Sequence, residues 1–103
     1  MSVKFLVLYP TPKDPEQFDR QYEREHLPMG QKALVGATGL ASHRILGSPA
    51  GKSPFFRMTE VTFPSLQALQ DCAAQPGAQK LLAHAVQIST GGAPHFMILE
   101  QEG

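Results

Sequence analysis

Residues 55–63 read FFRMTEVTF, and this stretch decides which fold the chain can adopt. Aromatic and β-branched residues dominate it, which is typical of a β-strand. Strand alternation would place Phe55, Arg57, Thr59, Val61 and Phe63 on one face and Phe56, Met58, Glu60 and Thr62 on the other. Because both faces carry large apolar side chains, we expect this strand to lie in a sheet that is covered on both sides.

Three further strands are expected around this one. Residues 3–9 (VKFLVLY) and 95–101 (HFMILEQ) are short apolar segments next to a proline, and residues 39–46 form a weaker strand. The Gly- and Pro-rich residues 47–54 are expected to be a loop that joins the second strand to the third.

Helices are expected at residues 15–26, 65–74 and 77–88. Asp14 is placed as the N-cap of the first helix, with Pro15 at its first position. Pro28 should end or redirect that helix, leaving one short helical turn at residues 33–35. The order βαββαβ indicates an α+β, ferredoxin-like fold with a four-stranded antiparallel sheet, formed by a single domain over residues 1–103.

Helices on one face of this sheet would leave the other face open. Leu6 and Leu8 of the first strand would then face water, together with part of the third and fourth strands. A contiguous apolar surface of this kind marks an interaction site. A second copy packed sheet against sheet would cover it, so we expect a twofold homodimer.

The composition narrows the classes of function. The 103 residues are 42% hydrophobic and 17% charged, and nine Lys and Arg balance nine Asp and Glu. A net charge of zero gives no electrostatic attraction to nucleic acid or anionic lipid. The apolar run at residues 3–9 is too short for a membrane span or a signal peptide, so a cytoplasmic protein is expected. The single cysteine, Cys72, excludes an internal disulfide and is expected to be an inert core thiol.

His26 is the strongest candidate for a catalytic residue. Imidazole exchanges a proton near neutral pH, and the expected place at a helix C-terminus favours its cation. Tyr22 lies on the same helical stripe, where its hydroxyl would orient a substrate oxygen, and the phenol of Tyr9 would reach the same place from the end of the first strand. An apolar cavity between the first helix and the sheet would be lined by Phe5, Val7, Phe18 and Leu81.

A structural role for these residues stays open. His26 would then bond a backbone carbonyl at the helix end, and Tyr22 would belong to the core. Glu23 and His26 form one Glu-x-x-His pair, whereas a di-iron site needs two such pairs, so no metal site is expected. His84 is a haem ligand in one interpretation and a packing or surface residue in another. No dinucleotide or phosphate-loop motif is present, and no organic cofactor is expected.

The chain resembles the EthD family of the dimeric α/β-barrel superfamily. The resemblance rests on Tyr9-Pro10, on Asp14-Pro15 and on residues 22–28 (YEREHLP), in which an aromatic residue stands four positions before a histidine and a proline two positions after it. It implies a homodimer whose two sheets close a barrel. It also implies a link to the bacterial degradation of ethyl tert-butyl ether, where the family's namesake accompanies a cytochrome P450 system.

Three functions follow as hypotheses. The first is an enzyme of ether or aromatic degradation that needs no cofactor and uses His26 as acid and base on a small apolar or weakly polar organic ligand. The second is a non-catalytic ligand-binding protein or an accessory protein to an oxygenase system. The third is a haem-binding protein.

Overall fold

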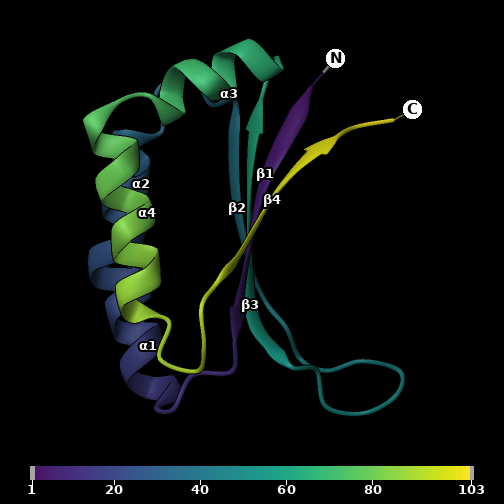
Figure 1. Ribbon diagram of the computed structural model, residues 1–103. Coiled ribbons are helices and arrows are strands. Elements are labelled where there is room, and N and C mark those ends of the chain that lie inside the picture. The colour runs from purple at the N-terminus through teal and green to yellow at the C-terminus, as the bar shows by residue number, and fades with distance from the viewer. Residues whose placement is uncertain (1, 103) are drawn as a thin grey trace.

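The computed structural model describes residues 2–102, which form a sheet with helices packed on one face (Figure 1). The strands are β1 (Val3–Pro10), β2 (Gly39–Arg44), β3 (Phe55–Phe63) and β4 (His95–Glu100). They lie in the order β2-β3-β1-β4, and each neighbouring pair is antiparallel. The expected ferredoxin-like βαββαβ order is therefore confirmed, although β2 and β4 end one or two residues earlier than expected.

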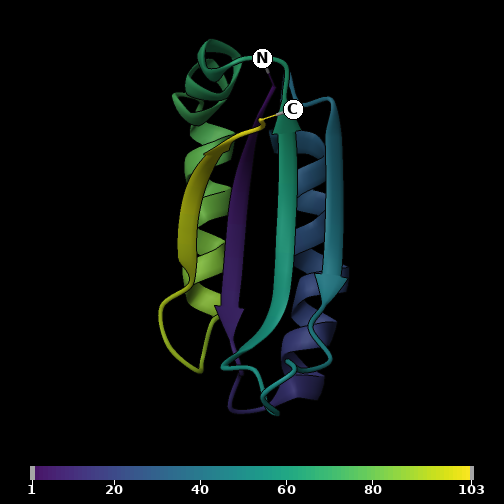
Figure 2. The same cartoon turned by 90° about the vertical axis from the view of Figure 1, so that its right-hand side faces the viewer.

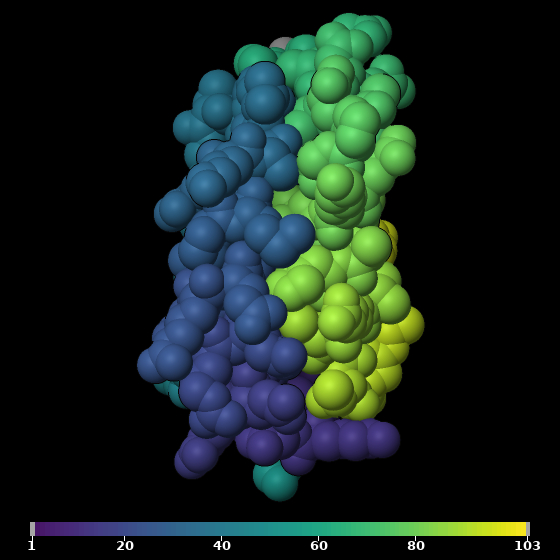
Figure 3. Space-filling view, turned by 90° about the vertical axis from the view of Figure 1, so that its left-hand side faces the viewer, coloured from purple at the N-terminus to yellow at the C-terminus, as the bar shows by residue number. Residues whose placement is uncertain are grey.

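In the described part of the chain, the helical layer consists of five segments: α1 (Pro15–Gln21), η1 (Tyr22–His26), α2 (Leu27–Ala33), α3 (Leu66–Ala73) and α4 (Pro76–Ile88). The α1–α2 segment lies beside α4 on the helical face (Figure 3). Asp14 Oδ1 accepts a hydrogen bond from the backbone N–H of Gln17 at 3.1 Å, and Ser65 caps α3 in the same way through Ala68. The expected N-cap of the first helix is therefore confirmed.

The expected end of the first helix at Pro28 is wrong, and so is the separate turn at residues 33–35. The chain continues as a helix to Ala33 through a π-helical turn, in which the backbone N–H of Leu27 donates to the carbonyl of Tyr22. Proline in a helix removes one hydrogen bond and crowds the preceding turn. The wider π turn directly before Pro28 relieves this conflict, and such turns are frequent at functional sites.

The register of β3 departs from simple alternation at one point. Tyr9 pairs with Arg57, whereas Pro10 pairs with Phe55, so that Phe56 is left without a partner on β1. A bulge of this kind shifts the following side chain to the other face of the sheet. Phe56 accordingly packs edge to face against Phe18 on the helical side, and the expectation that Phe55 shares a face with Arg57 is wrong.

The core lies between the sheet and the helices. The inward side chains Val3, Val7, Tyr9, Val61 and Phe63 are buried there, together with Phe18, Tyr22, Leu69, Cys72, Ala78, Leu81, Ala85 and Ile88. Cys72 lies on α3 as expected, and burial raises the pKa of its thiol.

Within residues 2–102, no helix covers the second face of the sheet (Figure 2). On β4, the side chains of Met97 and Leu99 lie on this face and are 38% and 41% exposed, while Leu6 and Leu8 on the neighbouring β1 are half-buried. Part of the apolar surface expected from the sequence is therefore present. Across residues 2–102, no helix has the length and apolar character needed to cross a membrane.

Candidate active site

Three aromatic rings form a continuous row along the first helical segment. The rings of Phe18 and Tyr22 stack with centroids 5.9 Å apart, and those of Tyr22 and His26 lie 5.5 Å apart. All three side chains are at most 8% exposed. The stripe predicted from the spacing of four residues is therefore confirmed, and the π turn leaves His26 facing the sheet.

A mainly apolar cavity of about 80 Å³ lies between the helices and the sheet. This volume is large enough for several water molecules or a small organic group. Of the residues expected around it, Phe5, Val7, Tyr9, Tyr22, His26 and Leu81 contribute to its wall. Phe18 does not, because its ring packs behind Tyr9, with 5.1 Å between the two ring centroids.

The polar end of the cavity is formed by Tyr9 and His26. The Tyr9 hydroxyl lies 3.2 Å from Nε2 of His26. Burial lowers the pKa of His26 to about 4, and the neighbouring His84 lowers it further in the same direction. Burial also raises the pKa of Tyr9, with Tyr22 adding to the effect. At neutral pH both groups are uncharged, so the expectation that a helix C-terminus favours a cationic His26 is wrong.

The Tyr22 hydroxyl is bonded within the protein. It lies 2.6 Å from Oγ1 of Thr59 on β3, and the guanidinium carbon of Arg57 lies 4.2 Å from the centroid of its ring. Thr59 also contributes to the cavity wall. A buried hydroxyl pair and a cation over the ring fix the orientation of Tyr22.

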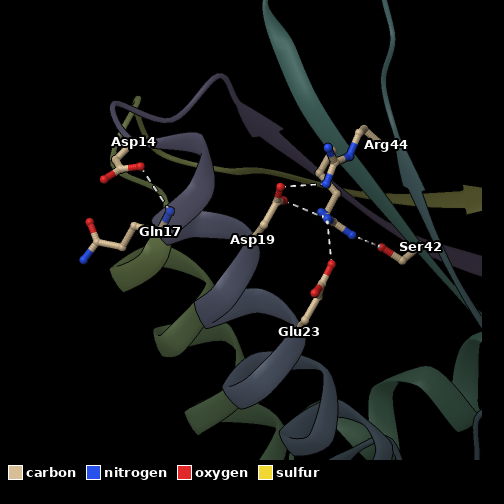
Figure 4. A network of polar contacts seen from close by, with 7 residues as sticks. Asp14, Gln17, Asp19, Glu23, Ser42 and Arg44 are labelled. Atoms are coloured by element: carbon tan, nitrogen blue, oxygen red, sulfur yellow. Dashed lines mark hydrogen bonds and ion pairs between the residues drawn. The ribbon is translucent and has the colours of Figure 1, made fainter.

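Arg57 is itself held by a network of charges at the helix–sheet boundary (Figure 4). Its Nη2 donates to Asp19 Oδ1 at 2.9 Å and its Nη1 donates to Ser42 at 3.1 Å. Arg44 Nη2 donates to the second oxygen of Asp19 at 2.6 Å. Glu23, which the sequence pairs with His26, instead lies 4.0 Å from Arg57.

His84 and Glu25 belong to the site, and sequence reasoning missed this role. Nδ1 of His84 lies 2.9 Å from Nδ1 of His26, and its Nε2 lies 3.3 Å from Oε1 of Glu25. One signal was available: His84 falls between Leu81 and Ala85 on the apolar side of its helix. For Arg57 and Thr59 the signal was their inward position in an otherwise apolar strand.

Both ring nitrogens of His84 face partners in the protein, Nδ1 toward His26 and Nε2 toward Glu25. Binding a haem iron would require breaking one of these contacts. Within residues 2–102, no three His, Cys, Asp or Glu side chains are grouped closely enough to hold a metal ion.

The arrangement is suited to moving a proton. A neutral imidazole accepts a proton at one nitrogen and releases one from the other. Here Nε2 of His26 faces the Tyr9 hydroxyl at the cavity, and Nδ1 faces away from it, toward His84.

Solved structures share this fold over all or nearly all of their length. An EthD family protein from Bacillus halodurans has a TM-score of 0.91 and 30% identity, covering 99% of this chain and 100% of its own. A dimeric ferredoxin-like protein of unknown function from Jannaschia sp. has a TM-score of 0.75 and 20% identity, covering 98% and 100%. A hydroxynitrile lyase from Passiflora edulis has a TM-score of 0.76 and 13% identity, covering 99% and 95%.

A comparison with curated proteins finds no match. The family model for the EthD domain matches residues 11–88, which include the π turn, His26 and His84. The family match covers well over half of the sequence and agrees with the Bacillus structure, so this chain belongs to the EthD family.

Proposed function

We propose that this protein is an enzyme that transfers a proton to or from a small organic molecule, with His26 as acid and base. The observation that carries the proposal is the contact of an uncharged, buried His26 with the Tyr9 hydroxyl at the polar end of an apolar cavity. Such a cavity suits a ligand with an apolar body and one oxygen. Proton transfer by a positioned side chain accelerates a reaction by roughly 10²–10⁴-fold.

In this mechanism the ligand oxygen takes the place of one partner in the Tyr9–His26 contact. Nε2 of His26 accepts the proton that the ligand loses, and the Tyr9 phenol, which stays protonated, donates a hydrogen bond to the oxygen on which negative charge develops. Return of the proton at the same or another atom completes the reaction. Phe5, Val7 and Leu81 enclose the apolar body of the ligand, and Tyr22, fixed by Thr59, closes the polar end. No electron is transferred in either step.

We further propose that the substrates are compounds of ether or aromatic degradation, in keeping with the ethyl tert-butyl ether degradation family to which the Bacillus protein is assigned. Hydroxynitrile lyase, with the same fold, is a precedent for chemistry on a small organic molecule.

A second copy of the chain is proposed to cover the open face of the sheet. Met97 and Leu99 lie there beside Leu6 and Leu8, and the Jannaschia protein of the same fold is described as dimeric. Burying these side chains removes apolar area from water at about 25 cal/mol per Å².

The test is turnover of a panel of aromatic, lactone and ether compounds by the wild-type protein, by His26→Gln and by His43→Gln. His43 is an exposed histidine on β2, with its side chain 50% exposed, and so provides a matched control. We expect a loss of at least 10²-fold for His26→Gln and wild-type rates for His43→Gln. Equal rates in all three proteins would overturn the role of His26, and a ligand that raises Tm without being consumed would favour a binding protein instead.

A further inference from the structure

A chain of hydrogen-bonding groups leads from the cavity to the surface. It runs from His26 on η1 to His84 on α4 and back to Glu25 on η1. Exposure increases along it: His26 is 8% exposed, the His84 side chain 13% and the Glu25 side chain 57%. The inner end therefore borders the cavity and the outer end is in contact with solvent.

The two imidazole rings meet edge to edge. Their planes differ by only 14°, and their centroids are 5.1 Å apart while the two Nδ1 atoms are 2.9 Å apart. Because the N–H bond and the lone pair of imidazole lie in the ring plane, this geometry aims one ring's proton at the other ring's lone pair.

When both imidazoles are neutral, these contacts fit one arrangement of protons. As a carboxylate, Glu25 only accepts, so Nε2 of His84 carries a proton and Nδ1 of His84 is bare. Nδ1 of His26 must then donate to it, which leaves Nε2 of His26 bare and accepting from Tyr9. The outer carboxylate thus determines that the nitrogen of His26 facing the cavity is the one without a proton.

We propose that His84 and Glu25 are positioning residues that hold His26 in its Nδ1–H form and relay its proton to solvent. When Nε2 of His26 accepts a proton from the ligand, its Nδ1 proton passes to Nδ1 of His84, and the Nε2 proton of His84 passes to Glu25 and then to water. Each histidine gains one proton and loses one, and one proton leaves the cavity. The relay rests on the proposed acid–base function.

The physical advantage is the place of the charge. A cationic His26 is costly inside an apolar wall, because burial disfavours the charged form. With the relay, positive charge does not remain on His26, since the proton leaves through the side of the ring that faces away from the ligand. The exposed Glu25 then exchanges the proton with bulk water.

The first test needs no substrate. Nitrogen-15 NMR of the histidine rings reports which nitrogen carries the proton, and we expect Nδ1–H for His26 and Nε2–H for His84 in the wild-type protein. Glu25→Gln should convert both rings to mixed forms, because the amide of Gln donates as well as accepts. Glu16→Gln, the matched exposed control on α1, should change neither ring. An Nε2–H form of His26, or unchanged rings in Glu25→Gln, would overturn the relay.

The second test uses turnover. His84→Asn keeps an acceptor for Nδ1 of His26 but has no second nitrogen to pass a proton onward. We expect kcat to fall by roughly 10-fold in His84→Asn and Glu25→Gln, less than the roughly 10²–10⁴-fold of a complete acid–base step because His26 itself is retained. KM should be unchanged, and Glu16→Gln should be as active as wild type. Wild-type kcat in both variants would overturn the relay. If the wild-type protein turns over none of the compounds, the proposed function is overturned. The histidine tautomers measured by nitrogen-15 NMR would still decide the relay independently.

Discussion

His26 and His84 are 58 positions apart in the sequence, yet their Nδ1 atoms are 2.9 Å apart. The contact joins the π turn η1 to α4, the two helical segments that lie side by side over the sheet (Figure 3). It gives the buried His26 a polar partner on the side away from Tyr9. Both ring nitrogens of a buried histidine are thus satisfied, as burial requires.

The stability of the protein should depend on pH through His26. Its pKa is about 4 in the folded chain, below the ordinary value of 6.5, so the unfolded chain binds more protons between these pH values. Stability from neutral His26 is therefore complete above pH 6.5 and is lost as pH falls toward 4, by about 3 kcal/mol in total. Tyr9, Tyr22 and His84 are the titratable groups in contact with the ring.

Urea denaturation between pH 7.5 and 4.5 would measure this loss. His26→Gln should lose less stability over the range than wild type, because the glutamine has no proton to gain. His43→Gln should follow the wild-type curve. Parallel curves for wild type and His26→Gln would show that the low pKa of His26 is wrong.

The hydrogen bond between Tyr22 and Thr59 should be measurable as a coupling energy. Thr59→Val leaves the buried Tyr22 hydroxyl without its partner and should cost about 1–3 kcal/mol of unfolding free energy. The double variant Tyr22→Phe with Thr59→Val removes both polar groups. It should therefore cost less than the sum of the two single changes. Chemical denaturation of the four proteins gives this cycle. Thr62→Val, on the other face of β3, should change stability by less than about 0.5 kcal/mol. Additive costs would contradict the bond.

Asp19 should be essential for burying Arg57. The Arg57 side chain is 8% exposed and that of Asp19 is 20% exposed, and Asp19→Asn removes the charge that compensates the guanidinium. We expect a loss of about 2–4 kcal/mol, since breaking a buried ion pair leaves an uncompensated charge. Asp71→Asn, at an exposed carboxylate on α3, should leave the denaturation midpoint nearly unchanged. Equal denaturation midpoints for Asp19→Asn and Asp71→Asn would show that solvent, and not Asp19, compensates the charge of the Arg57 guanidinium.

A charge on the open face of the sheet should separate the proposed dimer. Wild-type protein should sediment at twice the chain mass of 11.2 kDa, and Leu8→Glu should sediment as a monomer, because a carboxylate would be buried without a partner. Leu46→Glu is the matched control, since Leu46 is 94% exposed in the loop before β3. Wild-type protein that sediments as a monomer at micromolar concentration would contradict the dimer, and so would a dimeric Leu8→Glu.

Much of the fold was predictable because its signals are local. The alternation at residues 55–63, the proline that ends β1 and the capping residues Asp14 and Ser65 each act on their own segment. The register of β1 on β3 was not predictable in full. The bulge that moves Phe56 onto Phe18 depends on a ring 38 positions away.

The sequence also predicted the row of Phe18, Tyr22 and His26, because residues four apart share one side of a helix. It could not predict the π turn, since the crowding by Pro28 has two solutions: the helix ends, or it widens. Packing of the continued helix α2 against α4 favours the second solution.

By itself, the sequence determined the four strands, the helical face of the sheet and the side chains available for chemistry, because periodicity and chain breakers act over a few residues. Only the tertiary structure decided that His84 and Glu25 meet His26, that Thr59 holds Tyr22 and that His26 is uncharged. These properties depend on burial and on partners distant in sequence. Both arise only when the helices close over the sheet and exclude water.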